Sequence, residues 1–386
     1  MRIKEVELRI INLPLVRPFR TSFGTQHQRE LLLVKVSTHE GAEGWAECVA
    51  MSEPLYSPEY THASQDVMER FLLPKIFEHG DIRAEEVAGL LRPFLGHQMS
   101  KATVESAILD AQLKVEGISF GSYLGSAREE VDCGVSVGIS STVEKLVEEV
   151  SLYISQGYRR IKLKIEPGWD IEPVRVIREM WPDIPLQVDA NQAYTRADGA
   201  HLKQLDPFSL LLIEQPLDEH DLLGHALLAK ELSTPICLDE SITSLESARD
   251  ALALNATAII NIKPGRVGGY LESVKIHDLC VEKEISVWCG GMLETGIGRA
   301  ANIALASLPG FTLPGDTSAS SRYYHRDITT PFVMDDGRLR VPTEPGIGVG
   351  LNLDFMSAIE RRWPHGARNC WPTRSSSTVS RVRIIC

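Results

Sequence analysis

The stretch RIKLKIEPGWDIEPVRVIREMWPDIPLQVDAN, which spans residues 160–191, decides the fold class of this chain. It contains two short apolar runs, 160–165 and 186–188, and the residues between them have apolar side chains at helical spacing. A strand, a helix and a second strand in this order form a βα unit, whose two strands lie parallel in one sheet. The stretch therefore predicts an α/β architecture.

The same alternation continues on both sides of this stretch. Amphipathic segments separate eight apolar runs: 131–137, 160–165, 186–188, 210–213, 236–238, 258–262, 286–289 and 311–313. Eight parallel strands close a TIM barrel. An open, doubly wound sheet is the alternative, but no G-x-G-x-x-G turn follows a first strand, as it would in a dinucleotide-binding sheet. We therefore predict a TIM-type barrel.

Polar residues follow five successive strand candidates: Lys164, Asp189, Glu214, Asp239 and Lys263. Their spacings are 25, 25, 25 and 24 residues, which is one βα unit per step. In a TIM barrel this spacing places all five on the rim where active sites lie. A single acidic residue at such a place usually caps the next helix, and a single Lys-Pro-Gly is usually a turn. The regular spacing of all five is what indicates a functional site.

The chemistry of these residues predicts an enzyme that removes a proton from the carbon next to a carboxylate. Three carboxylates can bind one hard cation, and oxygen ligands favour Mg²⁺ or Mn²⁺ over zinc. Such a cation stabilises the negative charge that forms on a substrate carboxylate when the α-proton leaves, and the lysines would act as bases. Lys162 lies on the same strand face as Lys164. We therefore expect its charge to disfavour a proton on Lys164.

Two other classes of function would use part of the same set. A Schiff-base aldolase would use Lys164 or Lys263 as a nucleophile, but it would not need three acidic residues. A metal-binding scaffold without turnover would need the carboxylates, but it would give the lysines no role.

The first 125 residues have a pattern typical of a mixed α+β domain. Residues 2–9 and 31–37 have strand character, and residues 60–75 and 100–116 have helical spacing of apolar residues.

Three other stretches predict irregular structure. Residues 18–24 carry two aromatic residues and read as a loop, and residues 51–60 carry two prolines and read as a second loop. Residues 364–386 contain four arginines, no acidic residue and a Ser-Ser-Ser-Thr run. We expect residues 361–386 to form a disordered tail.

The bulk composition excludes several partners. The formal net charge is -12, which argues against a nucleic-acid or anionic membrane surface as the main partner. No apolar run approaches the roughly 18 residues of a membrane helix, and the N-terminus lacks the apolar core of a signal peptide. The seven cysteines are scattered without a C-x-x-C pair. We therefore expect a cytoplasmic protein without a disulfide framework.

Six stretches resemble the enolase superfamily, in particular its muconate-lactonising subgroup with Lys-x-Lys and a second lysine. They are PFRTSFG (18–24), IKLKIEPGWD (161–170), LIEQPL (212–217), NIKPGRVGG (261–269), WCGGM (288–292) and PGDTS (314–318). Within the subgroup they are most similar to o-succinylbenzoate synthases and N-succinylamino acid racemases. The resemblance implies an N-terminal α+β capping domain (1–125), a modified (β/α)7β barrel (126–330) and a segment (331–360) that returns to the cap.

The resemblance also implies a role for each matching residue. Asp189, Glu214 and Asp239 would bind the metal, Lys164 would be the base on one face of the substrate, and Lys263 the acid/base or cationic stabiliser on the other. The remaining implied positions fall into substrate contacts and supporting residues: Lys162, Asn191, Ser136, Gly291, Met292, Phe19, Met51 and Tyr56 at the substrate, and Glu240, Gln215 and Arg266 behind the metal ligands. The resemblance further implies a small carboxylate substrate and a homo-oligomer, either a dimer or an octamer.

Two reactions share this machinery, and the sequence leaves both open. A synthase needs one lysine to remove the α-proton before the β-hydroxyl leaves, whereas a racemase needs both lysines as proton shuttles. We expect Arg266, three residues after Lys263, to favour the neutral amine of Lys263 and so to favour racemisation. A muconate-type cycloisomerase and a dipeptide epimerase are alternatives. The epimerase would carry Asp-x-Asp near the eighth strand, where this chain has Asp316-Thr317-Ser318.

Overall fold

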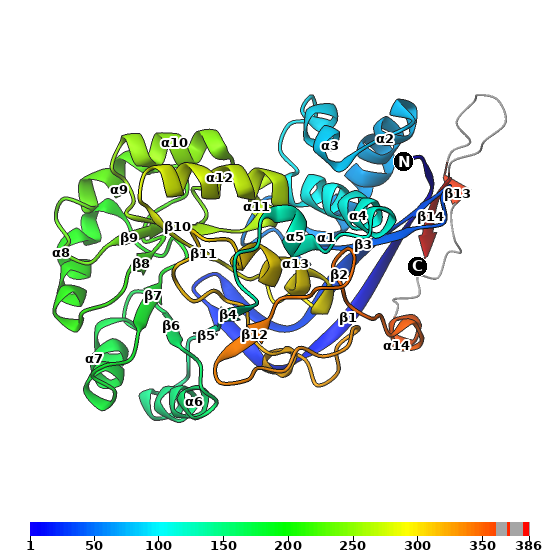
Figure 1. The fold of residues 1–386 in the computed structure, drawn as a ribbon. Helices are drawn as coiled ribbons and strands as arrows, with labels where there is room; N and C mark the ends of the chain where they lie inside the picture. The colour runs from blue at the N-terminus through cyan, green and yellow to red at the C-terminus, as the bar shows by residue number, and fades with distance from the viewer. Residues whose placement is uncertain (360–368, 371–380, 386) are drawn as a thin grey trace.

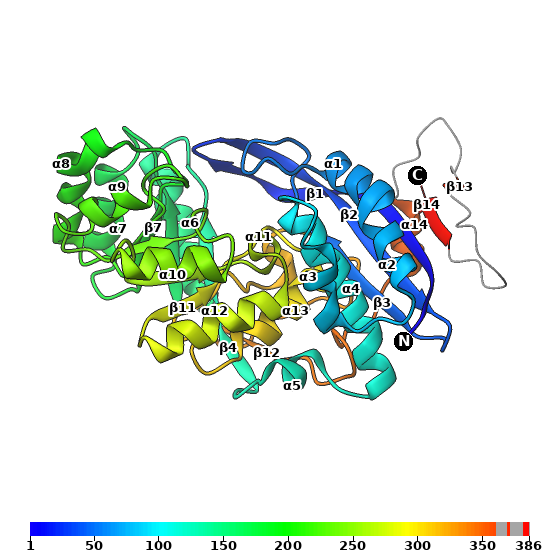
Figure 2. The ribbon, with the colours of Figure 1, turned by 90° about the horizontal axis from the view of Figure 1, so that it is seen from above.

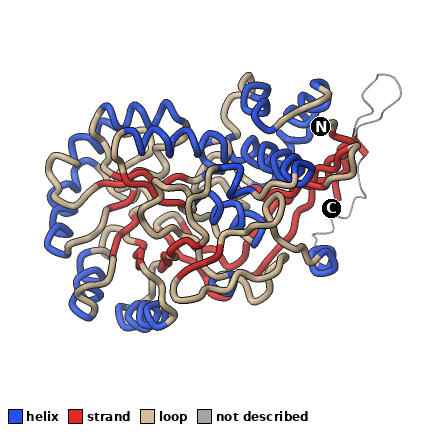
Figure 3. Tube along the Cα trace, in the orientation of Figure 1, coloured by secondary structure: helices blue, strands red, loops and turns tan. Residues whose placement is uncertain are grey.

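The computed structural model describes residues 1–359, 369–370 and 381–385. These residues form a cap, which contains the N-terminus, and a barrel, whose strands lie inside a layer of helices (Figure 1, Figure 3). A long hairpin of the cap extends across to the barrel (Figure 2).

The cap is built on a five-stranded sheet with the order β13-β14-β1-β2-β3. Its three long strands are β1 (Ile3–Thr21), β2 (Gly24–Thr38) and β3 (Glu43–Cys48). β2 contains a continuous apolar run, 31–34, that is fully buried, because helices cover one face of the sheet and the returning chain covers the other. The helices of this part are α1 (Thr61–Val67), a π-helical turn (Met68–Leu72), α2 (Leu73–His79), α3 (Ala84–Leu91), α4 (Gln98–Glu116) and α5 (Phe120–Leu124).

The loop predicted for residues 18–24 is largely wrong. Phe19, Arg20 and Thr21 pair with β2, and only Ser22 and Phe23 form the turn of the hairpin. The register of the two strands shifts between Pro14 and Phe19. Pro18 lies in that irregularity, where its missing N–H interrupts no ladder hydrogen bond, so the strand continues past it. The loop predicted for residues 51–60 is present.

The barrel contains a curled parallel sheet of seven strands with the order β11-β10-β9-β8-β7-β6-β5. The strands are β5 (Gly134–Val137), β6 (Arg160–Lys164), β7 (Leu186–Asp189), β8 (Ile213–Glu214), β9 (Ile236–Leu238), β10 (Ile259–Ile262) and β11 (Ser286–Cys289). The principal helices around them are α6 (Val143–Ser155), α7 (Ile171–Met180), α8 (Gly199–Leu202), α9 (Leu222–Leu228), α10 (Leu245–Ala253), α11 (Pro264–Val267), α12 (Tyr270–Glu282) and α13 (Gly296–Ala306). The predicted barrel class is confirmed.

The eighth predicted strand, 311–313, is not a regular strand. Instead, isolated bridges join Phe311 to Val287 and Gly315 to Cys133. Gly315 accepts a hydrogen bond from the backbone of Gly134 (2.7 Å). The segment therefore stands between β11 and β5 and closes the ring. It cannot form a continuous ladder because Pro314 has no N–H to donate.

Residues 331–359 pass the barrel and return to the cap. β12 (Arg338–Arg340) pairs with β4 (Glu130–Asp132), and α14 (Leu353–Ala358) ends beside the cap, where the carbonyl of Ile359 accepts from Asn12. The tail expected at 361–386 falls mostly outside the described residues. Within it the structure describes β13 (Asn369–Cys370) and β14 (Arg381–Ile385), and β14 runs parallel to β1.

Two buried glutamates of the cap join it to barrel helices at what we call the cap–barrel interface. Glu47 on β3 accepts hydrogen bonds from the backbone N–H groups of Thr295 and Gly298 at the start of α13 (each 3.1 Å). Glu105 on α4 accepts from the backbone of Leu271 in the first turn of α12 (3.1 Å). Each glutamate thus supplies an acceptor for N–H groups that a helix leaves without partners.

Candidate active site

The five predicted rim residues lie at the same end of neighbouring strands. Lys164, Asp189 and Glu214 are the last residues of β6, β7 and β8, and Asp239 and Lys263 directly follow β9 and β10. The register pairs Lys164 with Asp189 and Asp189 with Glu214. All five side chains are buried. The spacing argument therefore predicted their placement correctly. We call this group, together with its contacts, the rim.

Lys164 is held by two oxygen atoms of the barrel. Its Nζ donates to Asp189 Oδ2 and to Asn191 Oδ1, both at 2.6 Å. The amide of Asn191 in turn donates to Glu240 Oε1 at 2.9 Å. Asn191 therefore orients the lysine and is itself fixed from the next strand but one.

Lys263 is held by one oxygen of the barrel and one of the cap. Its Nζ donates to Asp239 Oδ2 and to the phenol oxygen of Tyr56, both at 2.7 Å. Burial lowers the pKa of Lys263, but the charges of Asp239, Tyr56, Glu214 and Glu240 together outweigh burial, so the pKa lies well above its usual range.

Lys162 lies among three carboxylates. Its Nζ is 2.8 Å from Asp316 Oδ2, 3.0 Å from Glu214 Oε2 and 3.3 Å from Asp189 Oδ2. Burial would lower its pKa, but these carboxylates raise it more. Lys162 is therefore a fixed cation that neutralises the floor of the site.

Asp316 is a site residue that our sequence reasoning did not select. It accepts from Lys162 and, at Oδ1, from Arg160 Nη2 (3.0 Å). Burial would raise its pKa, but these two cations hold it well below the usual range. Asp316 lies three residues beyond the run 311–313, whereas each of the other five residues lies in its strand run or directly after it. The regular spacing of strand ends therefore did not indicate it.

The three central carboxylates carry charges that repel one another. Burial, together with the charges of Asp189 and Asp239, raises the pKa of Glu214 well above its usual range. Lys164 and Lys162 more than offset the effect of burial on Asp189, whose pKa lies below its usual range. The charge of Lys263 also acts on Asp189, so the rim behaves as one electrostatic cluster.

The donor set of the rim fits a divalent cation in chemistry. All three candidate ligands offer oxygen, as hard cations require. Asp239 Oδ1 is buried yet accepts no hydrogen bond, and its neighbour Arg266 Nε lies at 3.5 Å. As the side chains of the described residues lie, no three His, Cys, Asp or Glu groups gather closely enough to hold a metal. The reason is local: lysine ammonium groups contact Asp189, Glu214 and Asp239.

The predicted supporting residues surround Asp239. The side-chain oxygen of Gln215 accepts from the backbone of Asp239 (3.0 Å), which fixes the start of the loop after β9. Glu240 is buried beside Asp239, and its pKa is raised to about 7, chiefly by burial. The guanidinium of Arg266 lies 4.5 Å from the ring centroid of Tyr56. Arg266 also approaches the carboxylate of Asp239 at Oδ1, whereas Lys263 contacts Oδ2 of the same carboxylate.

The predicted substrate contacts occupy different surroundings. Ser136 is the register partner of Lys162 on β5, and its buried hydroxyl makes no hydrogen bond. Met292 and Lys263 line a small cavity of about 30 Å³ between cap and barrel. Phe19 packs edge-on against Tyr323, with the ring centroids 6.3 Å apart.

Two further predicted contacts have close neighbours in the structure. Met51 accepts from Gln26 on the hairpin (3.2 Å). Gly291 leaves little room for a side chain, because a Cβ there would lie 3.2 Å from Asp316. The roles of all these residues toward substrate stay predictions.

The tip of the cap hairpin contacts the rim. The hydroxyl of Ser22 donates to the carbonyls of Ala190 (3.2 Å) and Asn191 (3.3 Å), and Arg20 pairs with Glu166 (2.8 Å). The residues after β6 and β7 are thus covered by the cap.

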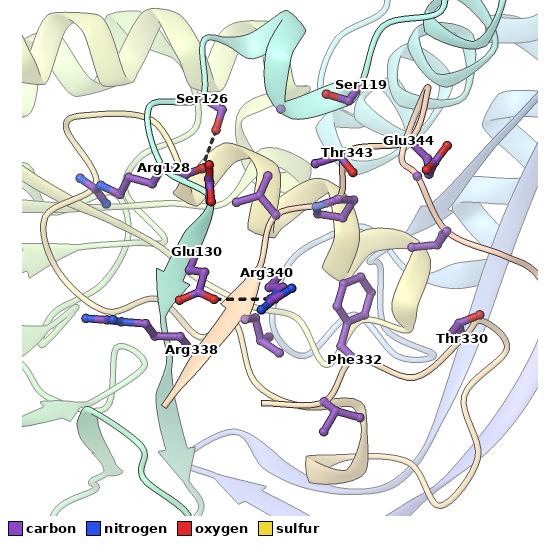
Figure 4. Close-up of a pocket in the computed structure, with 18 of the residues that line it drawn as sticks. Ser119, Ser126, Arg128, Glu130, Thr330, Phe332, Arg338, Arg340, Thr343 and Glu344 are labelled. Atoms are coloured by element: carbon purple, nitrogen blue, oxygen red, sulfur yellow. Dashed lines mark hydrogen bonds and ion pairs between the residues drawn. The ribbon is translucent and has the colours of Figure 1, made fainter. Parts of the chain in front are cut away.

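A cavity of about 1000 Å³ lies at the opposite end of the barrel, between β4, β12 and the loop after α5 (Figure 4). Two arginines that line it form ion pairs within the protein: Arg340 pairs with Glu130 (3.5 Å), and Arg338 with Asp132 (2.9 Å). None of the rim residues lines this cavity. We therefore place the chemistry at the rim, although the cavity there is smaller. Among the described helices, none combines the length and apolar composition that a membrane crossing requires.

Family models match both parts of the chain. Residues 5–125 match the model described as "Mandelate racemase / muconate lactonizing enzyme, N-terminal domain", and residues 145–355 match "Enolase C-terminal domain-like". A solved member of the enolase superfamily from Listeria innocua superposes with a TM-score of 0.90 at 41% identity, covering 94% of this chain and 98% of that one.

Curated relatives match over almost their whole length. The N-succinylamino acid racemase of Amycolatopsis sp. is 59% identical over 93% of this chain and 98% of its own. The o-succinylbenzoate synthase of Geobacillus stearothermophilus is 49% identical over 91% and 94%. Muconate cycloisomerase 1 of Rhodococcus opacus is more distant, at 27% identity over 94% and 99%. Enzymes of this superfamily generally use a divalent metal and act on small carboxylates. The chain is an enzyme and belongs to the enolase superfamily.

Proposed function

We propose that this enzyme removes the proton α to a carboxylate, and that it works as an o-succinylbenzoate synthase of the menaquinone route, as an N-succinylamino acid racemase, or as both. The observation that carries the proposal is the pair of buried lysines, Lys164 and Lys263, on opposite sides of three carboxylates. The names of the relatives at 59% and 49% identity support the same two reactions.

Asp189, Glu214 and Asp239 would hold the metal, which we propose to be Mg²⁺ (or Mn²⁺). When bound, the cation supplies positive charge beside the substrate carboxylate, where negative charge develops in the reaction. Two observations support this assignment: Asp239 Oδ1 accepts no hydrogen bond, and burial together with the charges of Asp189 and Asp239 raises the pKa of Glu214.

The side chains of the rim prepare the site for proton transfer. Burial excludes water, so fixed charges act more strongly than they would in solution. Lys162 stays cationic between Asp189, Glu214 and Asp316, and it balances their charge without taking part in proton transfer. Asn191 holds the amine of Lys164 in one direction.

Proton transfer itself would use the two lysines. Neutral Lys164 takes the α-proton onto Nζ, and the electron pair of the C–H bond delocalises into the substrate carboxylate. In racemisation, Lys263 delivers a proton from Nζ to the opposite face of the same carbon. In the synthase reaction, the electron pair instead expels the β-hydroxyl, which leaves as water with the proton from Lys164, while Lys263 stays a fixed cation.

The alternatives have weaker support. The position where a dipeptide epimerase would carry Asp-x-Asp has Asp316-Thr317-Ser318, and Asp316 is held by Lys162 and Arg160. For a muconate-type cycloisomerase, the support is a relative that is only 27% identical to this chain. A Schiff-base aldolase would leave the three acidic residues without a role. A metal-binding scaffold without turnover would leave the two lysines without a role.

Several further expectations belong to the same proposal. We propose a homo-oligomer, either a dimer or an octamer, without a nucleic-acid or membrane partner. We also propose a cytoplasmic location, which the free, buried thiols of five cysteines support: Cys48, Cys133, Cys237, Cys280 and Cys289. The division into residues 1–125, 126–330, 331–360 and 361–386 is also a proposal, supported by the break between the family models after residue 125.

A paired assay of the purified protein with Mg²⁺ or Mn²⁺ tests the proposal. One arm follows dehydration of the cyclohexadiene carboxylate precursor to o-succinylbenzoate. The other follows α-proton exchange and loss of optical rotation in N-succinyl-phenylglycine. Turnover in both arms makes the enzyme bifunctional, turnover in one arm assigns it to that reaction, and no turnover in either contradicts the proposal.

A further inference from the structure

The two lysines of the rim are held by different parts of the molecule. Lys164 contacts Asp189 and Asn191, which belong to β7 and the loop that follows it. Lys263 contacts Asp239 of the barrel, but also Tyr56, which belongs to the cap loop 51–60. One base is therefore oriented by the barrel alone, and the other by barrel and cap together.

Tyr56 completes a triangle with Lys263 and Asp239. Its hydroxyl accepts from Lys263 Nζ (2.7 Å) and donates to Asp239 Oδ2 (3.1 Å), the oxygen that Lys263 also contacts at 2.7 Å. The residue is 6% exposed, and its ring packs against Phe23 with the centroids 5.5 Å apart. Because the hydroxyl touches both partners, it fixes the direction in which the amine of Lys263 points.

The ring of Tyr56 has a separate function from its hydroxyl. Lys263 Nζ lies 5.0 Å from the ring centroid, and the guanidinium carbon of Arg266 lies 4.5 Å from it. Both cations are attracted to the ring whether or not it carries oxygen. A phenylalanine at this position would therefore keep the packing and lose only the hydrogen bonds.

We propose that Tyr56 is a positioning residue for Lys263, and that through it the cap controls proton transfer on one face of the substrate. The inference rests on the proposed two-lysine function. Racemisation then needs the loop 51–60 in place for one of its two proton transfers. The transfer at Lys164 does not depend on this contact, so the two faces of the substrate differ in their sensitivity to the cap.

Exchange of the α-proton for deuterium, measured separately for each enantiomer of N-succinyl-phenylglycine in D₂O by NMR, tests this asymmetry. Lys263→Ala first identifies the enantiomer whose proton Lys263 removes. We expect Tyr56→Phe to slow exchange of that enantiomer about tenfold or more, since a buried hydrogen bond to a charged group is lost. Exchange of the other enantiomer should change by less than about twofold, because the contacts of Lys164 are intact.

The ratio of the two exchange rates is taken on one preparation, so any loss of folded protein cancels. Phe23→Leu is the matched control, since it loosens the packing beside Tyr56 but leaves the hydroxyl; it should leave the ratio unchanged. Equal slowing of both enantiomers by Tyr56→Phe, or no slowing of either, would overturn the inference while the proposed function stands. If the unmodified enzyme exchanges neither enantiomer, the proposed racemase function fails and the inference fails with it.

Discussion

The rim and the cap–barrel interface both bury carboxylates, and each region neutralises them differently. At the rim, Asp189 and Asp316 face the ammonium and guanidinium groups of lysine and arginine, and their pKa values lie below the usual range although burial opposes this. At the cap–barrel interface, Glu47 and Glu105 accept hydrogen bonds mainly from backbone N–H groups. There burial is the largest influence and raises their pKa values to about 7 and about 8.

The difference shows what a helix N-terminus can and cannot do for a buried acid. The N-terminus of a helix offers about half a positive charge, spread over several N–H groups. A lysine offers a whole charge at one point, which offsets the desolvation of a carboxylate. At the rim, Asp189 and Asp316 therefore keep their negative charge in a dry site, although burial and charged neighbours raise the pKa of Glu214 there. The interface holds acids that are partly protonated near neutral pH.

The largest effect should come from removing the base at the rim. Lys164→Ala should lower kcat of both proposed reactions by about 10³-fold or more, because general-base catalysis is lost. Steady-state kinetics with both substrates measure the change. Lys275→Ala, at an exposed lysine of α12, is the control and should be neutral. Comparable activity in the two variants would show that Lys164 is not the catalytic base.

A second rim variant addresses stability instead of turnover. Lys162→Met should lower the free energy of unfolding by about 3–5 kcal/mol, because it leaves buried carboxylates without their cation. Urea unfolding followed by circular dichroism gives the value. A loss below about 1 kcal/mol would show that Lys162 does not neutralise the floor of the site, and the contrast between the regions would weaken.

At the cap–barrel interface, the raised pKa of Glu105 should make the free energy of unfolding depend on pH. The folded protein raises the pKa of Glu105 from 4.5 to about 8, so it binds more protons than the unfolded chain between these values. The free energy of unfolding should therefore fall as pH rises from about 5 to 9, with Glu105 contributing about 4 kcal/mol. Glu105→Gln keeps an acceptor for Leu271 but cannot ionise, so its curve should be flatter by that amount. Identical slopes for the two proteins between pH 5 and 9 would contradict the prediction. Glu47 titrates in both proteins and cancels in the comparison.

The smallest effect concerns Arg266. Its guanidinium reaches Asp239 and the ring of Tyr56, close to Lys263. If its charge favours the neutral amine of Lys263, Arg266→Gln should slow racemisation about tenfold and the synthase reaction much less. Parallel kcat/KM measurements with the two substrates test this. Equal losses in both would remove Arg266 as the source of a bias.

Sequence spacing predicted the rim well because one βα unit is nearly constant in length here. Lys164 and Lys263 could be placed on the same end of the barrel without any knowledge of contacts between them. The same rule missed Asp316, because this residue lies three positions beyond the run 311–313, in a segment that pairs through isolated bridges and not through a regular strand. The prediction of a loop at 18–24 was wrong for a different reason. Proline usually marks the end of a strand, but here a local shift in register accommodates Pro18 and the strand continues.

The cap–barrel interface could not be predicted from the sequence. Glu47 and Thr295 are 248 residues apart, and Glu105 and Leu271 are 166 apart. A buried glutamate in a strand or helix resembles any other glutamate until the helix that it caps is known. The contacts of Tyr56 with Lys263 belong to the same class, because they depend on how the two domains dock.

The ring of the barrel is closed where its backbone pairing is weakest, and Asp316 lies there. Two isolated bridges hold the segment in place, while Lys162 and Arg160 of β6 form ion pairs with the carboxylate of Asp316. Closure of the barrel and neutralisation of the catalytic floor are thus one event. We therefore expect that a newly synthesised chain gains the full charge balance of its site only after its last barrel segment is in place.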